Sequence, residues 1–148
     1  MYDILLALHN ITRWLVLVAA IWALARAFMG WRNKSAWTES DRKAGLFYGI
    51  FIDIQFLLGL ILSFVSPIVT GAFEDLGQAM QVTGLRIILA EHIPLMVLAL
   101  IVVHITSSRI KQAEDDAAKH RRALIGYGLA TLLILIAIPW ARRLFPGL

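Results

Sequence analysis

The sequence predicts an all-α integral membrane protein, a single transmembrane domain (residues 1–148) folded as an up-down-up-down four-helix bundle. Hydrophobic residues make up 59% of the chain and charged residues 16%, whereas a soluble domain is about 45–50% apolar and about 25% charged. Four apolar segments have the length of a membrane span, and basic residues gather in alternate connections between them. This topology accounts for the net charge of +4, so we expect no nucleic-acid partner.

Each of the four segments has about the 20 mainly apolar residues that a helix needs to cross roughly 30 Å of hydrocarbon. They cover residues 4–29, 44–65, 83–106 and 123–140. The third contains Pro94, which has no amide hydrogen to donate to the carbonyl of Ala90, so we expect a kink near His92. The fourth contains no ionisable side chain.

Two local patterns flank the second span. Gly45 and Gly49 form a G-x-x-x-G pattern at its start, which predicts close contact with another helix. After it, Phe73, Leu76 and Met80 recur at spacings of three and four residues, which predicts one short amphipathic helix in the outer loop.

Lysine and arginine residues predict the orientation in the membrane. They cluster around the first and third connections, as Arg26, Arg32, Lys34, Arg42, Lys43, Arg109, Lys111, Lys119, Arg121 and Arg122. The connection 66–82 has none and carries Glu74 and Asp75. Because short basic loops stay in the cytoplasm, we expect the second connection and both termini outside. Arg142 and Arg143 near the end of the chain oppose this orientation, but the first helices usually dominate it.

Polar side chains inside the apolar segments are the candidate functional residues, because ionisable groups in a span are costly unless they are paired or face a wet interior. They are His9, Arg13, Asp53, Gln55, Arg86, Glu91, His92 and His104. At about 1.5 Å per residue, His9 lies about 8 Å from the outer end of its span, and Arg13, Glu91 and His92 lie about 12–13 Å deep. These four therefore share one layer in the outer half of the bundle.

Two imidazoles from different helices at similar depth are what axial ligation of a b-type haem requires, so His9 and His92 are the candidate metal ligands. Arg13 and Arg86 are candidate partners for the haem propionates, and we expect Glu91 to border the interior beside His92. The chain has no cysteine, which excludes disulfides, iron–sulfur ligation and covalently attached haem.

Other interpretations of the polar layer remain open. Arg13 and Glu91 can form a buried ion pair that fixes helix register, or Glu91 and His92 can accept protons in a quinone site. Asp53 is either part of a proton relay with Gln55 or a hydrogen-bond donor to a neighbouring helix. We expect a structural role for His104 near the inner end, and a place for His120 in the cytoplasmic loop.

Several motifs together resemble a group of small bacterial four-helix membrane proteins that are described as cytochrome b-like. They are His9-x-x-x-Arg13-Trp14, the stretch from Gly59 to Phe64-Val65-Ser66-Pro67, Glu91-His92 after Arg86, and Lys119-His120. The resemblance runs over nearly the whole chain. It implies a multi-pass protein of the bacterial cytoplasmic membrane that works beside respiratory or photosynthetic electron-transfer complexes.

The expected function is therefore that of a small b-type cytochrome-like subunit, which passes electrons between a quinone or membrane partner and an acceptor at the outer face. It would carry one non-covalent haem b and transfer electrons rather than chemical groups. The alternative is a cofactor-free accessory subunit that stabilises a larger respiratory or photosynthetic membrane complex through its lipid-facing helices.

Overall fold

The protein is all-helical in the computed structural model, which describes residues 1–140 and contains no strand in that range. Four helical stretches are long and apolar enough to cross a membrane, so the chain has the form of a multi-pass membrane protein. They are α1 (Tyr2–Asn33), α2 (Glu39–Val65), the continuous stretch Thr83–Lys111 and α7 (Asp116–Ala137). The stretch Thr83–Lys111 consists of α5 (Thr83–Arg86), the π-helix η1 (Ile87–His92) and α6 (Ile93–Lys111).

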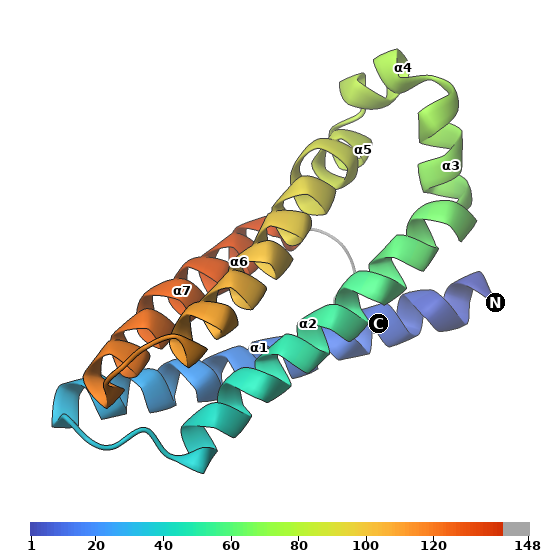
Figure 1. Cartoon of the computed structure of the whole chain (residues 1–148). Helices are drawn as coiled ribbons and strands as arrows, with labels where there is room; N and C mark the ends of the chain where they lie inside the picture. Colours follow the sequence, from blue (N-terminus) through green and yellow to red (C-terminus); the bar gives the residue numbers. More distant parts are fainter. Residues whose placement is uncertain (141–148) are drawn as a thin grey trace.

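The long helices pack through small side chains. In Figure 1, α1 lies against α2 and α7, and α6 lies against α7 and α2. The buried positions of α1 include Ala19, Ala20, Ala23 and Ala27, and large apolar side chains such as Ile21 remain exposed. In a membrane the tails of lipids are as apolar as leucine, so helices associate where small residues allow close packing. The large exposed side chains are suited to face lipid.

Capping groups set where α1 ends and α2 begins. Lys34 takes a left-handed backbone conformation (φ 51°) and ends α1. Thr38 and Asp41 form a capping box at the start of α2, in which the Thr38 amide donates to Asp41 Oδ2 at 2.7 Å. Asp41 also accepts a hydrogen bond from Arg26 Nε at 2.9 Å, which ties α1 to this cap.

The ends of the helices differ from the ends of the apolar segments from which they were predicted. α1 continues to Asn33, α6 continues to Lys111, and α7 begins at Asp116 and ends at Ala137, before Trp140. Hydropathy marks only the part of a helix that matches the lipid, whereas the helix itself begins at its cap. For α7 that cap is Asp115, whose carboxylate accepts the amide of Ala118 at 2.7 Å. Arg142 and Arg143, together with the end of the chain, lie outside the described residues.

The irregular geometry expected near His92 takes the form of the π-helix η1. Its residues end two positions before Pro94, and the amide of Ile93 donates to the carbonyl of Ile88, five residues back. A proline cannot donate its own hydrogen bond, and its ring crowds the preceding turn, which the wider π-helical turn relieves. The disturbance thus widens the helix just where it carries His92.

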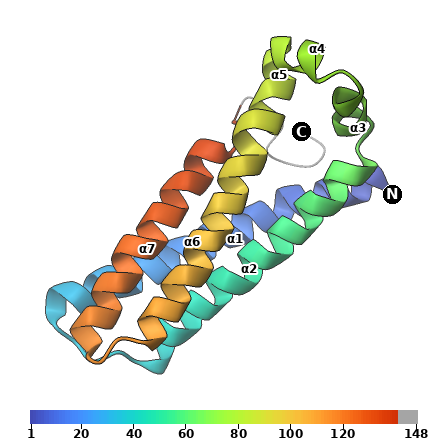
Figure 2. The same ribbon diagram turned by 45° about the horizontal axis from the view of Figure 1, so that its top comes forward.

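Two short helices, rather than the single amphipathic helix expected, connect α2 to α5. They are α3 (Pro67–Glu74) and α4 (Leu76–Gln81), and Figure 2 shows them bridging from the end of α2 to the start of α5. The prediction of one helix through Phe73 and Met80 was wrong because Asp75 interrupts it. The Asp75 carboxylate caps α4 by accepting the amide of Gln78 at 2.9 Å. We call this part of the molecule the α3–α4 end, and the opposite part, with the connections 34–38 and 112–115, the basic end.

Candidate functional site

His92 reaches from η1 to the end of α7. Its ring nitrogen Nδ1 lies 2.9 Å from the backbone carbonyl oxygen of Ala137. A carbonyl only accepts, so Nδ1 carries the proton and donates it. Ala137 is the last residue of α7, where carbonyls have no partner within the helix, and the imidazole supplies one. With the proton on Nδ1, the lone pair of the ring lies on Nε2.

His9 faces α2 from the first third of α1. The amide nitrogen of Gln55, a residue only 3% exposed, lies 3.1 Å from His9 Nε2 and donates to it. Gly59, one turn further along α2, makes room for the ring, because a Cβ at this position would lie 3.2 Å from His9 Cε1. Two buried atoms of this pair, His9 Nδ1 and Gln55 Oε1, have no hydrogen-bond partner. Most buried polar atoms do have one, so this polar site is incompletely satisfied.

The structure brings His9 and His92 together. Their ring centres lie 6.3 Å apart and their planes are inclined by 75°. Imidazole nitrogens lie about 2.0–2.1 Å from a bound metal. Two such bonds on opposite sides of one metal, with the half-widths of two five-membered rings, place the ring centres roughly 6.3 Å apart. The observed separation equals this value, and it also lies within the range of an edge-to-face contact between two rings.

Arg13 is buried one turn from His9. It is 9% exposed, and its guanidinium carbon lies 5.7 Å from the centre of the Trp14 ring. At that distance the cation is attracted to the face of the indole. The role of Arg13 toward a haem propionate stays a prediction.

Arg86 and Glu91 lie on the outside of the third long stretch. Both side chains are exposed. The expectation that Glu91 borders the interior beside His92 was therefore wrong, and among residues 1–140 no ion pair joins Glu91 to Arg13.

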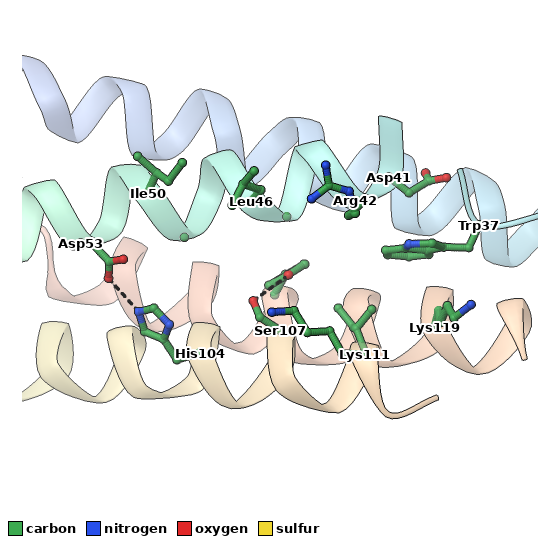
Figure 3. Close-up of a pocket in the computed structure, with 14 residues that line it drawn as sticks. Trp37, Asp41, Arg42, Leu46, Ile50, Asp53, His104, Ser107, Lys111 and Lys119 are labelled. Carbon is green, nitrogen blue, oxygen red and sulfur yellow. Dashed lines mark hydrogen bonds and ion pairs between the residues drawn. The ribbon is translucent and has the colours of Figure 1, made fainter. Parts of the chain in front are cut away.

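Asp53 and His104 form a second polar pair, about midway along α2 and α6. His104 Nε2 lies 2.7 Å from Asp53 Oδ1, and the side chains are 53% and 51% exposed. Figure 3 shows the two side chains pointing toward each other from the facing helices. Of the two alternatives for Asp53, the contact with His104 agrees with a hydrogen bond to a neighbouring helix. Gln55 instead contacts His9.

His120 is a residue that sequence reasoning misplaced. It belongs to α7 rather than to a loop, and it is fully buried, with its ring centre 4.9 Å from that of Trp37. Neither ring nitrogen has a hydrogen-bond partner in the described part of the chain. The signal was present in the spacing: residues 120, 123, 127, 130, 134 and 137 of α7 are all buried, which is the three-and-four pattern of a helix face. Because the Asp115 cap starts α7 at Asp116, the buried face of the helix includes His120.

Between Met1 and Trp140, no group of three histidine, aspartate or glutamate side chains lies close enough together to hold a metal ion. Comparisons of the chain with protein-family models, curated proteins and solved structures found no match. The geometry of the two polar sites therefore carries the functional argument.

Proposed function

We propose that the protein is a small b-type cytochrome-like membrane subunit that binds one haem between His9 and His92 and takes part in electron transfer. The observation that carries this proposal is the 6.3 Å separation of the two ring centres. It matches two axial imidazoles on one iron, for which the porphyrin supplies the remaining nitrogen ligands. A bound haem would supply one-electron oxidation and reduction.

The surroundings of the two rings support the same proposal. His92 has its Nδ1 hydrogen bonded to the Ala137 carbonyl, which fixes the ring orientation and increases its basicity as a ligand. His9 would ligate a metal through Nδ1, which is buried without a partner, with the Gln55 amide turned so that its oxygen, also without a partner, accepts the proton of Nε2. A group bound between the helices would account for polar atoms that the chain leaves unsatisfied.

The remaining predicted residues receive roles by their positions. Arg13, buried next to His9, would pair with one propionate, and Arg86, exposed near the α3–α4 end, would pair with the other from the surface. Glu91 is exposed beside His92 and would set the local charge at the site. In the orientation that the basic connections predict, the site lies in the outer half of a bacterial cytoplasmic membrane. Electrons would pass between a quinone or membrane partner and an acceptor at the outer face.

The test is a dithionite-reduced minus air-oxidised absorbance spectrum, with haem quantified as the pyridine haemochrome. The full chain is purified in mild detergent after expression with sufficient haem. We expect a b-type spectrum at about one haem per chain, consistent with one pair of axial histidines. His9→Ala and His92→Ala should each lose the haem, and His104→Ala, the matched control, should keep it. Well-folded, colourless wild-type protein, or haem retained in both outer variants, would contradict the proposal.

A second candidate function is that of a cofactor-free accessory subunit of a larger membrane complex. The observation that favours it is the exposure of large apolar side chains at the α3–α4 end, where Ile68, Phe73 and Leu76 are 46%, 56% and 49% exposed. Exposed apolar clusters beyond the ends of long helices are suited to contact a partner. This candidate predicts colourless protein that co-migrates with a large complex in mild detergent, and a monodisperse, unpartnered species would contradict it.

A further inference from the structure

A groove of about 440 Å³ opens between α2 and α6, on the side of the molecule toward the basic end (Figure 3). Its walls include Trp37, Gly45, Gly49, Asp53, His104 and Tyr127. Small-molecule sites in proteins occupy roughly 300–1,000 Å³, with mostly apolar walls and a few convergent polar groups. The groove has this size and this character.

The Asp53–His104 pair forms the polar part of the wall. Its carboxyl and imidazole are about half exposed, although both lie within stretches that can span a membrane. An acid and a base exposed toward hydrocarbon are costly. A ligand that hydrogen bonds to the pair would lower this cost, and an imidazole paired to a carboxyl can either donate to or accept from such a ligand.

The two glycines of the G-x-x-x-G pattern differ in what they contact. A Cβ on Gly45 would lie 2.5 Å from the Tyr127 hydroxyl, so this glycine allows the close helix contact that its pattern predicts. A Cβ on Gly49 would meet nothing within 4 Å. Gly49 therefore leaves one part of the groove open, one turn of α2 before Asp53.

The charges nearest Asp53 favour an uncharged ligand over a phospholipid headgroup. Three basic residues lie in the wall toward the basic end: Arg42 pairs with Glu39, Lys119 pairs with Asp116, and Lys111 stands at the end of α6, about two turns from His104. Asp53 adds a carboxyl group deeper in the groove. Cations already paired attract a phosphate weakly, because their charge is largely compensated.

We infer that the groove binds the ring of a membrane quinone or quinol, with Asp53 and His104 hydrogen bonded to its oxygen atoms. Such a ligand is planar and uncharged, dissolves in the bilayer, and carries oxygens that accept hydrogen bonds in one form and donate them in the other. The inference deepens the proposed function by naming the electron-exchange partner, and its functional meaning rests on that proposal. The site differs from the quinone site considered at Glu91 and His92.

Trp37 in the groove wall provides the measurement. Full-length protein in phosphatidylcholine nanodiscs is titrated with decylubiquinone, and tryptophan fluorescence is followed. Trp37→Phe identifies the contribution of Trp37 among the five tryptophans of the chain. We expect quenching of Trp37 that saturates. His104→Leu should weaken binding about tenfold, as expected for the loss of one well-placed hydrogen bond.

Gly49→Leu is the decisive variant. Its Cβ meets no protein atom within 4 Å and the rest of its side chain projects into the groove, so it should remove the saturable quenching and leave the fold intact. Gly71→Leu is its matched control, because a Cβ on Gly71 of α3 also meets nothing within 4 Å and lies away from the groove. Quenching that is linear in quinone and equal in wild type and Gly49→Leu would overturn the inference.

Two other occupants of the groove would also overturn it. If phosphatidylglycerol added to the nanodiscs displaces the quinone completely at low mole fraction, the groove is a lipid site. If the single thiol of Gly49→Cys forms a disulfide-linked dimer in the membrane, a second copy of the chain covers the groove.

Failure of this inference is distinguishable from failure of the haem proposal. A b-type spectrum without saturable quinone binding would overturn the quinone site alone. Conversely, saturable quinone binding by a colourless protein would overturn the haem proposal and leave the groove assignment intact. His9→Ala, which should lose haem and keep quinone binding, tests the independence of the two sites.

Discussion

At the scale of single residues, glycines decide where the two unusual histidines are held. Gly30 of α1 packs directly on the buried His120 of α7, and Gly59 of α2 packs on His9. In both cases the missing side chain is replaced by an imidazole ring from another helix. Small residues are expected where membrane helices approach closely, but here they also fix the position of a polar ring.

Gly30→Ala should destabilise the protein although alanine favours a helix. A Cβ there would lie 2.0 Å from His120 Cε1, and overpacking of this kind costs about 1–3 kcal/mol, against a gain of about 1 kcal/mol in helix propensity. Thermal unfolding followed by circular dichroism in detergent should show a lower midpoint. The double variant Gly30→Ala/His120→Ala should recover part of the loss, and an unchanged midpoint in Gly30→Ala would contradict the packing.

Gly59→Leu should reduce haem content without unfolding the protein. The added side chain would displace the His9 ring, which lies 3.2 Å from the position of a Cβ, and an axial ligand displaced by about 1 Å binds poorly. Haem per chain is measured as the pyridine haemochrome. Gly71→Leu serves as the control, and equal haem content in the two variants would show that the position of His9 does not matter.

At the scale of elements, hydrophobicity predicted the four long helices but not their ends or their faces. The apolar stretches are long enough to identify spans without knowledge of any contact. By contrast, the break at Asp75 and the start of α7 at Asp116 are set by carboxylate caps on backbone amides. Such local hydrogen bonds compete with continued helix and leave only a weak trace in the sequence.

Part of the candidate site could also be predicted from the sequence. Depth along a helix follows from counting residues, so the proximity of His9 and His92 could be expected. The exposure of Glu91 could not, because counting residues gives the depth of a side chain but not the face of the bundle on which it lies. The Asp53–His104 pair depends on which faces of α2 and α6 meet, and that is a tertiary property.

The cap of α2 provides an element-scale prediction. Thr38→Ala removes one half of the capping box and should cost about 1 kcal/mol. Asp41→Ala should cost more, about 2 kcal/mol, because it removes the cap and also leaves Arg26 without its carboxylate at 2.9 Å. Thermal unfolding in detergent shows which of the two variants has the lower midpoint and so loses more stability. A larger effect of Thr38→Ala would show that the link to α1 is unimportant.

At the scale of the whole molecule, the distribution of basic residues predicts which end faces the cytoplasm. The chain has no cysteine, so a single introduced thiol reports its own location. Gln78→Cys, in α4, should react with a membrane-impermeant maleimide in intact spheroplasts. Ser35→Cys, between α1 and α2, should react only after the membrane is permeabilised. The reverse pattern would invert the topology and place the His9–His92 site in the inner half of the membrane.

The π-helix also has a consequence for how relatives of this chain should be aligned. A π-helical turn arises when one residue more than an α-helix needs lies between two fixed contacts. Here η1 ends at His92, whose ring contacts the Ala137 carbonyl. A homologue whose third span is regular throughout would be one residue shorter before its histidine. A single-residue gap in that interval would therefore mark a change in helical geometry and in the direction of the ring, rather than an error of alignment.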